Sequence, residues 1–309
     1  MADVAFAAAQ TDFAVGLLRE AAVGSNASLI LSPISIALAL SLAYAGAGGD
    51  TRREFERVFA RGGIPGDTLD LQFHRSFAQL TAAHRNVLLE LANRAYVEHE
   101  VEVKAAYKET IEQNFGGNFE QVDFRRPAGV AAQINAFVTN ATHQKIRDLL
   151  SSEAIHEKTR LLLVNALYFK GVWDEPFAGR STGKETFFIA ENNEQQVDLP
   201  RFKIESQFEL KELLQKLGFS EAFEKTANFS GISDELLYVS KGVHKTFIEV
   251  KEKETEAAAA TAILMPPYVS ARWMGFEELV SFRADHPFAF LVTYEKQPLF
   301  FGRYTGPSL

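Results

Sequence analysis

Residues 251–268 read KEKETEAAAATAILMPPY, a run of small residues between a strand-like segment and a double proline. Glutamate and alanine favour helices, so one interpretation of the run is a helix. The preceding residues 246–250, TFIEV, have the pattern of a half-buried strand, and no turn residue separates them from the alanines. The second interpretation is therefore an extension of that strand.

As a strand, the run would have two different faces, because successive side chains point to opposite sides of a sheet. One face carries Thr255, Ala257, Ala259 and Thr261, and the other carries Glu254, Glu256, Ala258 and Ala260. The first face has no side chain larger than threonine. Such a segment could enter a gap in a packed sheet, or it could remain outside as a loop.

The run ETEAAAATA after FIEVKEK resembles the hinge of the reactive-centre loop of serpins, protease inhibitors in which a cut loop inserts as an extra strand. The resemblance implies one α+β domain over residues 1–309 with the serpin fold. This fold has a large mixed sheet, called sheet A, together with helices and a C-terminal hairpin. The reactive-centre loop would span about residues 252–285, with the hinge at 254–261.

Four further segments resemble the same family. They are LILSPISIALALSLAYAGAGGDT at 29–51, ANRAY at 92–96, RLLLVNALYFKGVWDEPF at 160–177, and the hairpin that begins with DHPFAF at 285–290 and ends with GRYTGP. Apolar residues dominate 161–170, which predicts a strand buried on both faces. In the first segment, Ser32 is placed as an N-cap and Pro33 as the first residue of a buried helix that ends near Ala45.

The resemblance also assigns roles to particular side chains. It implies that Ser32, Ser35, Asn165 and His244 form a polar cluster that controls the opening of the main sheet, and that Trp173 lies at the top of that sheet. Taken singly, Asn165 or His244 is equally interpreted as a core residue with satisfied hydrogen bonds. Trp173 without the resemblance would be ordinary core packing.

The chain departs from the family between Asp198 and Leu199. ETFFIAENNEQQVD at 185–198 resembles the start of one serpin sheet, whereas LPRFKIESQFELKELLQKLGF at 199–219 resembles a strand and helix that come several elements later. We therefore expect a short form whose second sheet is incomplete and has exposed strand edges. Residues 130–150, by contrast, are predicted to form one helix that ends in QKIRDLL, as in the family.

Counting along the family pattern places the reactive bond between Tyr268 and Val269, which would suit a chymotrypsin-like protease. Tyr268 is equally interpreted as a plain loop aromatic. Residues 269–285 are longer than usual for the segment after the cut, so Arg272 and Met274 are alternatives, and Arg272 would suit a trypsin-like protease. The other departure is Glu254, where the family usually has glycine; because Glu254 lies on the outer face, we expect slower insertion and not a block.

Composition narrows the functional classes. The net charge of −8 and the absence of a basic stripe argue against a nucleic-acid partner. The chain has no cysteine, which excludes disulfides and thiolate chemistry, and its seven histidines lack metal-ligand spacing. No G-x-S-x-G, H-E-x-x-H or P-loop motif occurs, so we expect neither a catalytic residue, nor a metal, nor a cofactor.

Location and partners follow from the same features. The N-terminus lacks the pattern of a secretory signal, which favours the cytosol, although the family resemblance also allows an extracellular protein. The uncharged stretch 21–49 is interrupted by Ser32 and Pro33, and its helix is too short for a membrane span. The expected partner is a target serine protease, with cysteine proteases as secondary targets, and the protein is expected to be a monomer.

Three functions remain open at this point. The first is suicide inhibition of a serine protease through cleavage and insertion of the loop. The second is a non-inhibitory serpin-like binding protein or an inactive short isoform, which the internal gap would favour. The third is an α/β enzyme without a recognisable motif.

Overall fold

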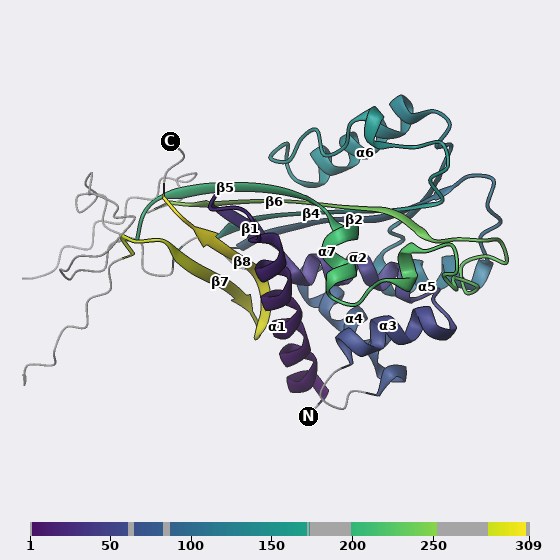
Figure 1. The fold of residues 1–309 in the computed structure, drawn as a ribbon, viewed down its shortest axis with the longest axis horizontal. Coiled ribbons are helices and arrows are strands. Elements are labelled where there is room, and N and C mark those ends of the chain that lie inside the picture. Colours follow the sequence, from purple (N-terminus) through teal and green to yellow (C-terminus); the bar gives the residue numbers. More distant parts are fainter. Residues whose placement is uncertain are drawn as a thin grey trace, which may run out of the picture.

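The computed structural model describes residues 2–60, 65–82, 87–171, 173, 199–251 and 284–306. The helices are α1 (Ala2–Ala21), α2 (Pro33–Tyr44), α3 (Gly49–Phe59), α4 (Gly66–Thr81), α5 (Ala105–Phe115), α6 (Pro127–Ala141) and α7 (Leu210–Lys216). The strands are β1 (Leu29–Leu31), β2 (Val87–Glu98), β3 (Phe119–Val122), β4 (Leu161–Gly171), β5 (Phe202–Glu209), β6 (Val239–Val250), β7 (Phe288–Tyr294) and β8 (Gln297–Tyr304). The α+β class is confirmed (Figure 1).

Among the described residues, the larger sheet has five strands in the order β3-β2-β4-β6-β5. The pairs β2/β3 and β4/β6 are parallel, whereas β2/β4 and β5/β6 are antiparallel. This is the large mixed sheet that the sequence predicts. Its two middle strands, β4 and β6, are hydrogen-bonded neighbours, with Asn165 opposite His244 in the register.

Each face of this sheet covers its own hydrophobic core. Leu163 and Leu167 of β4 lie in the core that α2 and the smaller sheet share, whereas Val164 and Tyr168 lie in the core beneath α6. In Figure 1, α6 lies above the sheet, and the helices from α2 to α5 lie below it. The first eight residues of β4 are buried on both faces, as the apolar run predicts.

Helix α2 is the buried central helix that the sequence predicts. Ser32 is its N-cap in an extended conformation, its hydroxyl oxygen accepts a hydrogen bond from the backbone N–H of Ser35, and Pro33 is the first helical residue. Every residue of the helix is buried. The N-terminus of α2 is thereby fixed against the larger sheet.

The prediction of one helix over residues 130–150 was wrong at its C-terminal end, because α6 ends at Ala141. The Thr142 hydroxyl donates to the carbonyl of Val138 and accepts from the N–H of Ile146, which offers the chain an alternative to helix. His143 and Gln144 then adopt positive φ angles of 48° and 62°. Residues 142–150 therefore continue as an irregular segment across the sheet.

The smaller sheet has the order β1-β8-β7, and its last two strands form the predicted C-terminal hairpin. Glu295 and Lys296 make the turn with φ angles of 46° and 69°, which matches the twist of the flanking strands. Within the described part of the chain this second sheet has only these three strands, with β7 at its edge. Residues 185–198, which resemble the start of a serpin sheet, lie outside the described residues, so the incompleteness of the second sheet stays a prediction.

Candidate functional site

The candidate site is the seam between β4 and β6, because these parallel strands end at the same edge of the sheet and the alanine run begins just after β6. Leu161 pairs with Val239 at one end of the seam, and Tyr168 pairs with Phe247 toward the other. A segment that turned back after β6 would be antiparallel to β6 and also to β4. Such a segment could pair with both strands if they separated.

A polar cluster lies across this seam on the α2 side of the sheet. Its members are Ser32 and Ser35 at the start of α2, Asn93 on β2, Asn165 on β4 and His244 on β6; Asn93 is 2% exposed and the others are fully buried. Asn93, Asn165 and His244 are opposite one another in the register of three adjacent strands. The structure thus brings together the four polar residues that the sequence singles out, and adds Asn93.

Asn165 is at the centre of the cluster. Its side-chain nitrogen donates to the backbone carbonyl of Ser35 at 2.8 Å and also contacts the side-chain oxygens of Ser35 and Asn93. Asn93 donates to the same Ser35 carbonyl at 3.1 Å. A single backbone oxygen at the start of α2 therefore ties β2 and β4 to the helix.

His244 connects β6 to the same group. Its Nε2 accepts a hydrogen bond from the backbone N–H of Ser32 at 3.1 Å, so the ring proton is on Nδ1, which donates to the side-chain oxygen of Asn165. This arrangement requires a neutral ring. Burial lowers the pKa of His244 to about 3, because the charged form would lose its hydration.

We expect His244 to make the protein less stable in mild acid. The unfolded chain takes up a proton at His244 below pH about 6.5, whereas the native ring stays neutral down to about pH 3. The stability that the neutral ring contributes is therefore present above pH about 6.5 and falls as the pH decreases toward 3, with a loss of about 3 kcal/mol by pH 4.5. Urea unfolding at several pH values measures the effect.

The control for this prediction is His244→Gln, because glutamine can donate and accept at similar positions but does not titrate. The variant should lack this part of the pH dependence, so the difference in unfolding free energy between parent and variant should shrink toward pH 4.5. Parallel pH profiles for the two proteins would contradict the assignment of a buried neutral histidine.

A second set of contacts crosses β6 on the opposite face. Lys245, 8% exposed, forms an ion pair with Glu205 of β5 at 2.9 Å and donates to the carbonyl of Arg147 at 2.8 Å. Gln207 of β5 donates to the carbonyl of Leu149 at 2.9 Å. The irregular segment after α6 is therefore attached to β5 and β6, next to the seam.

Trp173 lies at the end of the seam where β4 and β6 both finish. It follows β4, and its indole N–H donates to the backbone carbonyl of Lys251, the residue after β6, at 2.7 Å. The side chain is 41% exposed. Trp173 therefore bridges the C-terminal ends of β4 and β6, at the point where a strand would begin to enter.

The remaining predicted site residues lie outside the described residues. These are the hinge residues Glu254, Thr255, Glu256, Ala257, Ala258, Ala259, Ala260 and Thr261, and the candidate reactive residues Tyr268, Val269, Arg272 and Met274. Their roles stay predictions. Across the described parts of the chain, no helix has the length and apolar character needed to cross a membrane.

Asn93 and Thr246 are two site residues that the sequence analysis missed. The Thr246 hydroxyl donates to the carbonyl of Ile30 at 3.2 Å and so attaches β6 to β1 on the same face as His244. A signal for Asn93 is present in the sequence, because it alternates with Leu91 and Ala95 on what is otherwise an apolar face. A polar residue at that position of a buried strand needs a buried partner.

Comparison with known proteins gives a consistent result. The family model described as "Serpin (serine protease inhibitor)" matches residues 8–199 and 190–307. Serpin B6 of Pongo abelii is 29% identical, covering 97% of this chain and 99% of that protein, and neuroserpin of Mus musculus is 28% identical, covering 92% and 88%. The crystal structure of Serpin48, described as a highly specific serpin in the insect Tenebrio molitor, superposes with a TM-score of 0.84 at 27% identity and 98% coverage of both chains.

The comparisons also locate the internal gap. The match to Serpin B6 extends over 379 positions, more than the 309 residues of this chain, so that relative has residues without a counterpart here. The family match is divided into two segments, and both include residues 190–199. This is where the sequence passes from ETFFIAENNEQQVD to LPRF, as expected for a short form.

Proposed function

Because the chain belongs to the serpin family of serine protease inhibitors, we propose that it traps a serine protease by offering residues 252–285 as bait and inserting the cut loop between β4 and β6. The observation that carries the proposal is the seam itself. It joins two parallel strands, the hinge follows β6 in the sequence after three residues, and a buried polar cluster crosses the seam. We take residues 1–309 as one domain built for this purpose.

The chemistry would belong to the target protease. Its nucleophile attacks the bait bond and forms an acyl-enzyme, which water normally hydrolyses. Insertion of the loop would add on the order of ten ladder hydrogen bonds, each worth roughly 0.5 to 1.5 kcal/mol net. This energy would distort the attached protease before hydrolysis, so the uncut protein must be held kinetically in a less stable state.

The polar cluster would set the barrier to insertion in this proposal. Separating β4 from β6 removes their ladder hydrogen bonds and pulls His244 away from Asn165. Each buried polar group left without a partner costs about 1 to 3 kcal/mol. The cluster therefore favours the closed sheet until a strand is available to replace the lost pairing.

Incubation with chymotrypsin tests the proposed function. An inhibitor should give a covalent complex that survives SDS and contains one protease per chain, because the acyl bond is trapped. Trypsin serves as the second arm, because a cut after Arg272 would favour it. Mass spectrometry of the released C-terminal fragment identifies the bond: a fragment beginning with Val269 supports Tyr268 as bait, and one beginning with Trp273 supports Arg272.

The internal gap favours one second candidate, a serpin-like protein that binds without inhibiting. Such a protein would be clipped by chymotrypsin and would release the active protease without a complex. That outcome with both proteases, from a chain shown to be folded, would contradict inhibition by insertion and support this alternative. Turnover of hydrolase substrates by the chain itself would instead favour the third function, an α/β enzyme without a recognisable motif.

A further inference from the structure

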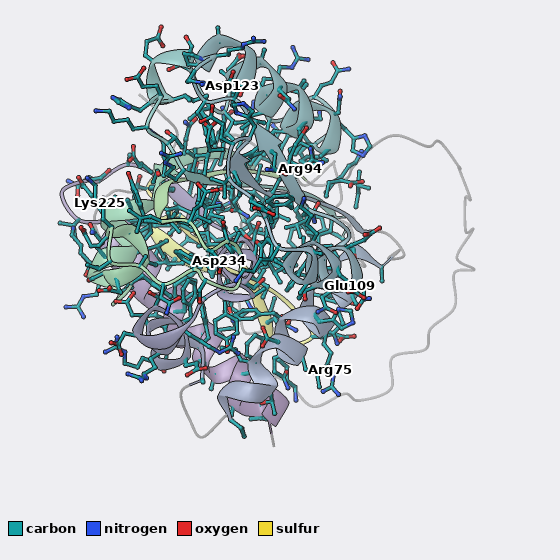
Figure 2. All side chains as sticks on the ribbon, turned by 90° about the vertical axis from the view of Figure 1, so that its right-hand side faces the viewer. Arg75, Arg94, Glu109, Asp123, Lys225 and Asp234 are labelled. Carbon is teal, nitrogen blue, oxygen red and sulfur yellow. The ribbon has the colours of Figure 1, made fainter. Side chains whose placement is uncertain are left out.

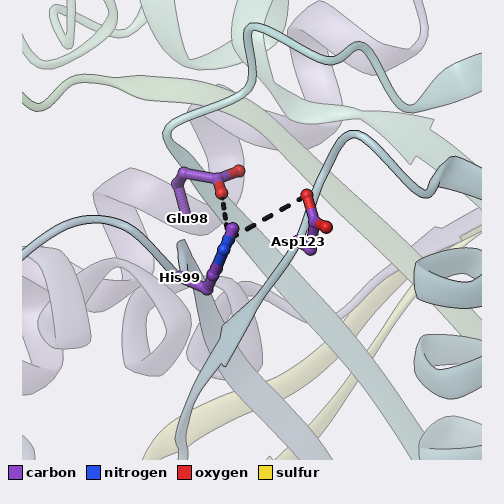
Figure 3. A group of neighbouring side chains, drawn as sticks. All are labelled: Glu98, His99 and Asp123. Atoms are coloured by element: carbon purple, nitrogen blue, oxygen red, sulfur yellow. Dashed lines mark hydrogen bonds and ion pairs between the residues drawn. The ribbon is translucent and has the colours of Figure 1, made fainter.

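Three potential metal ligands converge at the end of the larger sheet opposite Trp173. Glu98 closes β2, His99 follows it, and Asp123 follows β3. The parallel pairing of Glu98 with Val122, and a hydrogen bond from the His99 N–H to the Val122 carbonyl at 2.9 Å, fix these two chain segments side by side. One ligand atom from each of the three side chains lies within 4.8 Å of the others (Figure 3).

Two of the separations bracket the ligand spacing of a zinc site. His99 Nδ1 lies 2.5 Å from a Glu98 carboxylate oxygen and 3.9 Å from an Asp123 carboxylate oxygen. Ligands that are each about 2.0 to 2.2 Å from a tetrahedral zinc are separated by about 3.3 to 3.6 Å. A change of the exposed His99 side-chain torsions that moves Nδ1 by roughly 1 Å would bring both distances close to this spacing.

Glu98 is the preorganised member of the group. Its side chain is 4% exposed, and its second carboxylate oxygen accepts the backbone N–H of Phe124 at 3.1 Å. A buried carboxylate with a fixed second-shell partner is what holds a metal ligand in orientation. Asp123 lies in the same layer as α6 at the periphery of the molecule, and His99 is 40% exposed, so an ion can reach the group from solvent (Figure 2).

Two arginines bring positive charge to this group: Arg126 lies 3.4 Å from Asp123, and Arg125 makes the closer contacts. Its guanidinium contacts Asp123 at 2.9 Å, Glu100 at 2.9 Å and Nε2 of His99 at 3.2 Å. The side chain is 53% exposed, so its removal from the group costs little. Because Arg125 donates to Nε2, the His99 ring proton is on Nδ1, directed at Glu98.

We infer that Glu98, His99 and Asp123 bind one zinc ion, with water as the fourth ligand, and that Arg125 is displaced when the ion enters. Imidazole nitrogen and carboxylate oxygen are a suitable ligand set for zinc. On binding, the Nδ1 proton is replaced by the metal and the ring carries its proton on Nε2. Arg125 then loses its acceptor on His99, so metal and guanidinium exclude each other.

Calorimetric titration of the full chain with ZnCl2 tests this inference. The parent should bind one zinc ion at this site, His99→Ala should weaken the affinity by about tenfold or more, and Arg125→Gln should tighten it by roughly three- to tenfold, because a repelling charge is removed. A specific zinc site predicts that the two substitutions change the affinity in opposite directions. Nonspecific attraction of the cation to surface charge does not predict a loss of affinity in His99→Ala. Absorption of a bound Co²⁺ ion would report tetrahedral coordination independently.

His143→Ala is the matched control, because His143 also faces a carboxylate, Glu90 at 3.0 Å, but among the described residues it has no third potential ligand. It should leave zinc affinity unchanged. No zinc binding by the parent, an equal loss in both histidine variants, or weaker binding by Arg125→Gln would overturn the inference. Thermal unfolding of each variant without metal confirms that it is folded, and none of these outcomes depends on protease inhibition.

Discussion

Replacing Ala257 by arginine is expected to turn the protein from an inhibitor into a substrate. The parity of the alanine run places Ala257 on the small face with Thr255 and Ala259, which would point toward the α2 side of the sheet on insertion. On that side, the flanking positions Leu167 of β4 and Thr246 and Ile248 of β6 are at most 2% exposed. A guanidinium at this place would be buried without a partner.

The expected size of the effect follows from a competition between two rates. Insertion must be completed before water hydrolyses the acyl-enzyme, and a barrier raised by about 3 kcal/mol slows insertion by roughly a hundredfold. Hydrolysis of the acyl-enzyme would then be faster than insertion. Chymotrypsin would cut the variant and be released in active form. The ratio of clipped chain to SDS-stable complex on a gel measures the change.

Ala258→Arg is the matched control, because the adjacent residue has the opposite parity. It would point to the opposite face, where β6 already carries a cation: Lys245 pairs with Glu205 and donates to the carbonyl of Arg147, so a guanidinium there could also find polar partners. This variant should still trap protease. If Ala257→Arg trapped protease as well as the parent, or if both variants failed equally, the assignment of the inward face would be wrong.

Much of the fold could be predicted from local pattern. The cap of α2 at Ser32, the doubly buried strand β4 and the strand that ends at Val250 follow from capping residues and apolar periodicity. The end of α6 did not follow, because the hydroxyl of Thr142 competes for backbone partners, and such competition is decided by tertiary contacts.

The site was predictable to a smaller extent. Asn165 and His244 are single polar residues in apolar surroundings. Only the resemblance to a family pattern predicted that they lie together, because their contact depends on the parallel register of β4 and β6. Asn93 could have been found by strand parity. The group of Glu98, His99 and Asp123 could not, because strand pairing brings Asp123 beside the other two from 24 residues further along the chain, and no local spacing marks it.

Cleavage of the loop is expected to raise the melting temperature of the protein strongly. In the described structure the larger sheet has five strands, and its middle strands are already paired with each other. Insertion of the cut loop would make it a six-stranded, mainly antiparallel sheet with a net gain of roughly 5 to 15 kcal/mol from the added hydrogen bonds. For a chain of 309 residues this corresponds to an increase of roughly 8 to 23 °C.

Calorimetry of the protein before and after limited proteolysis within residues 252–285 measures this increase, and gel analysis confirms that the two fragments remain associated. Ala257→Arg, cut in the same way, provides the control, because its loop should be unable to enter and its melting temperature should change little. An unchanged melting temperature for the cut parent would mean that β4 and β6 do not separate. The seam would then be only a closed part of the sheet, and the missing elements near residue 198 would have removed the energy that the proposed trap requires.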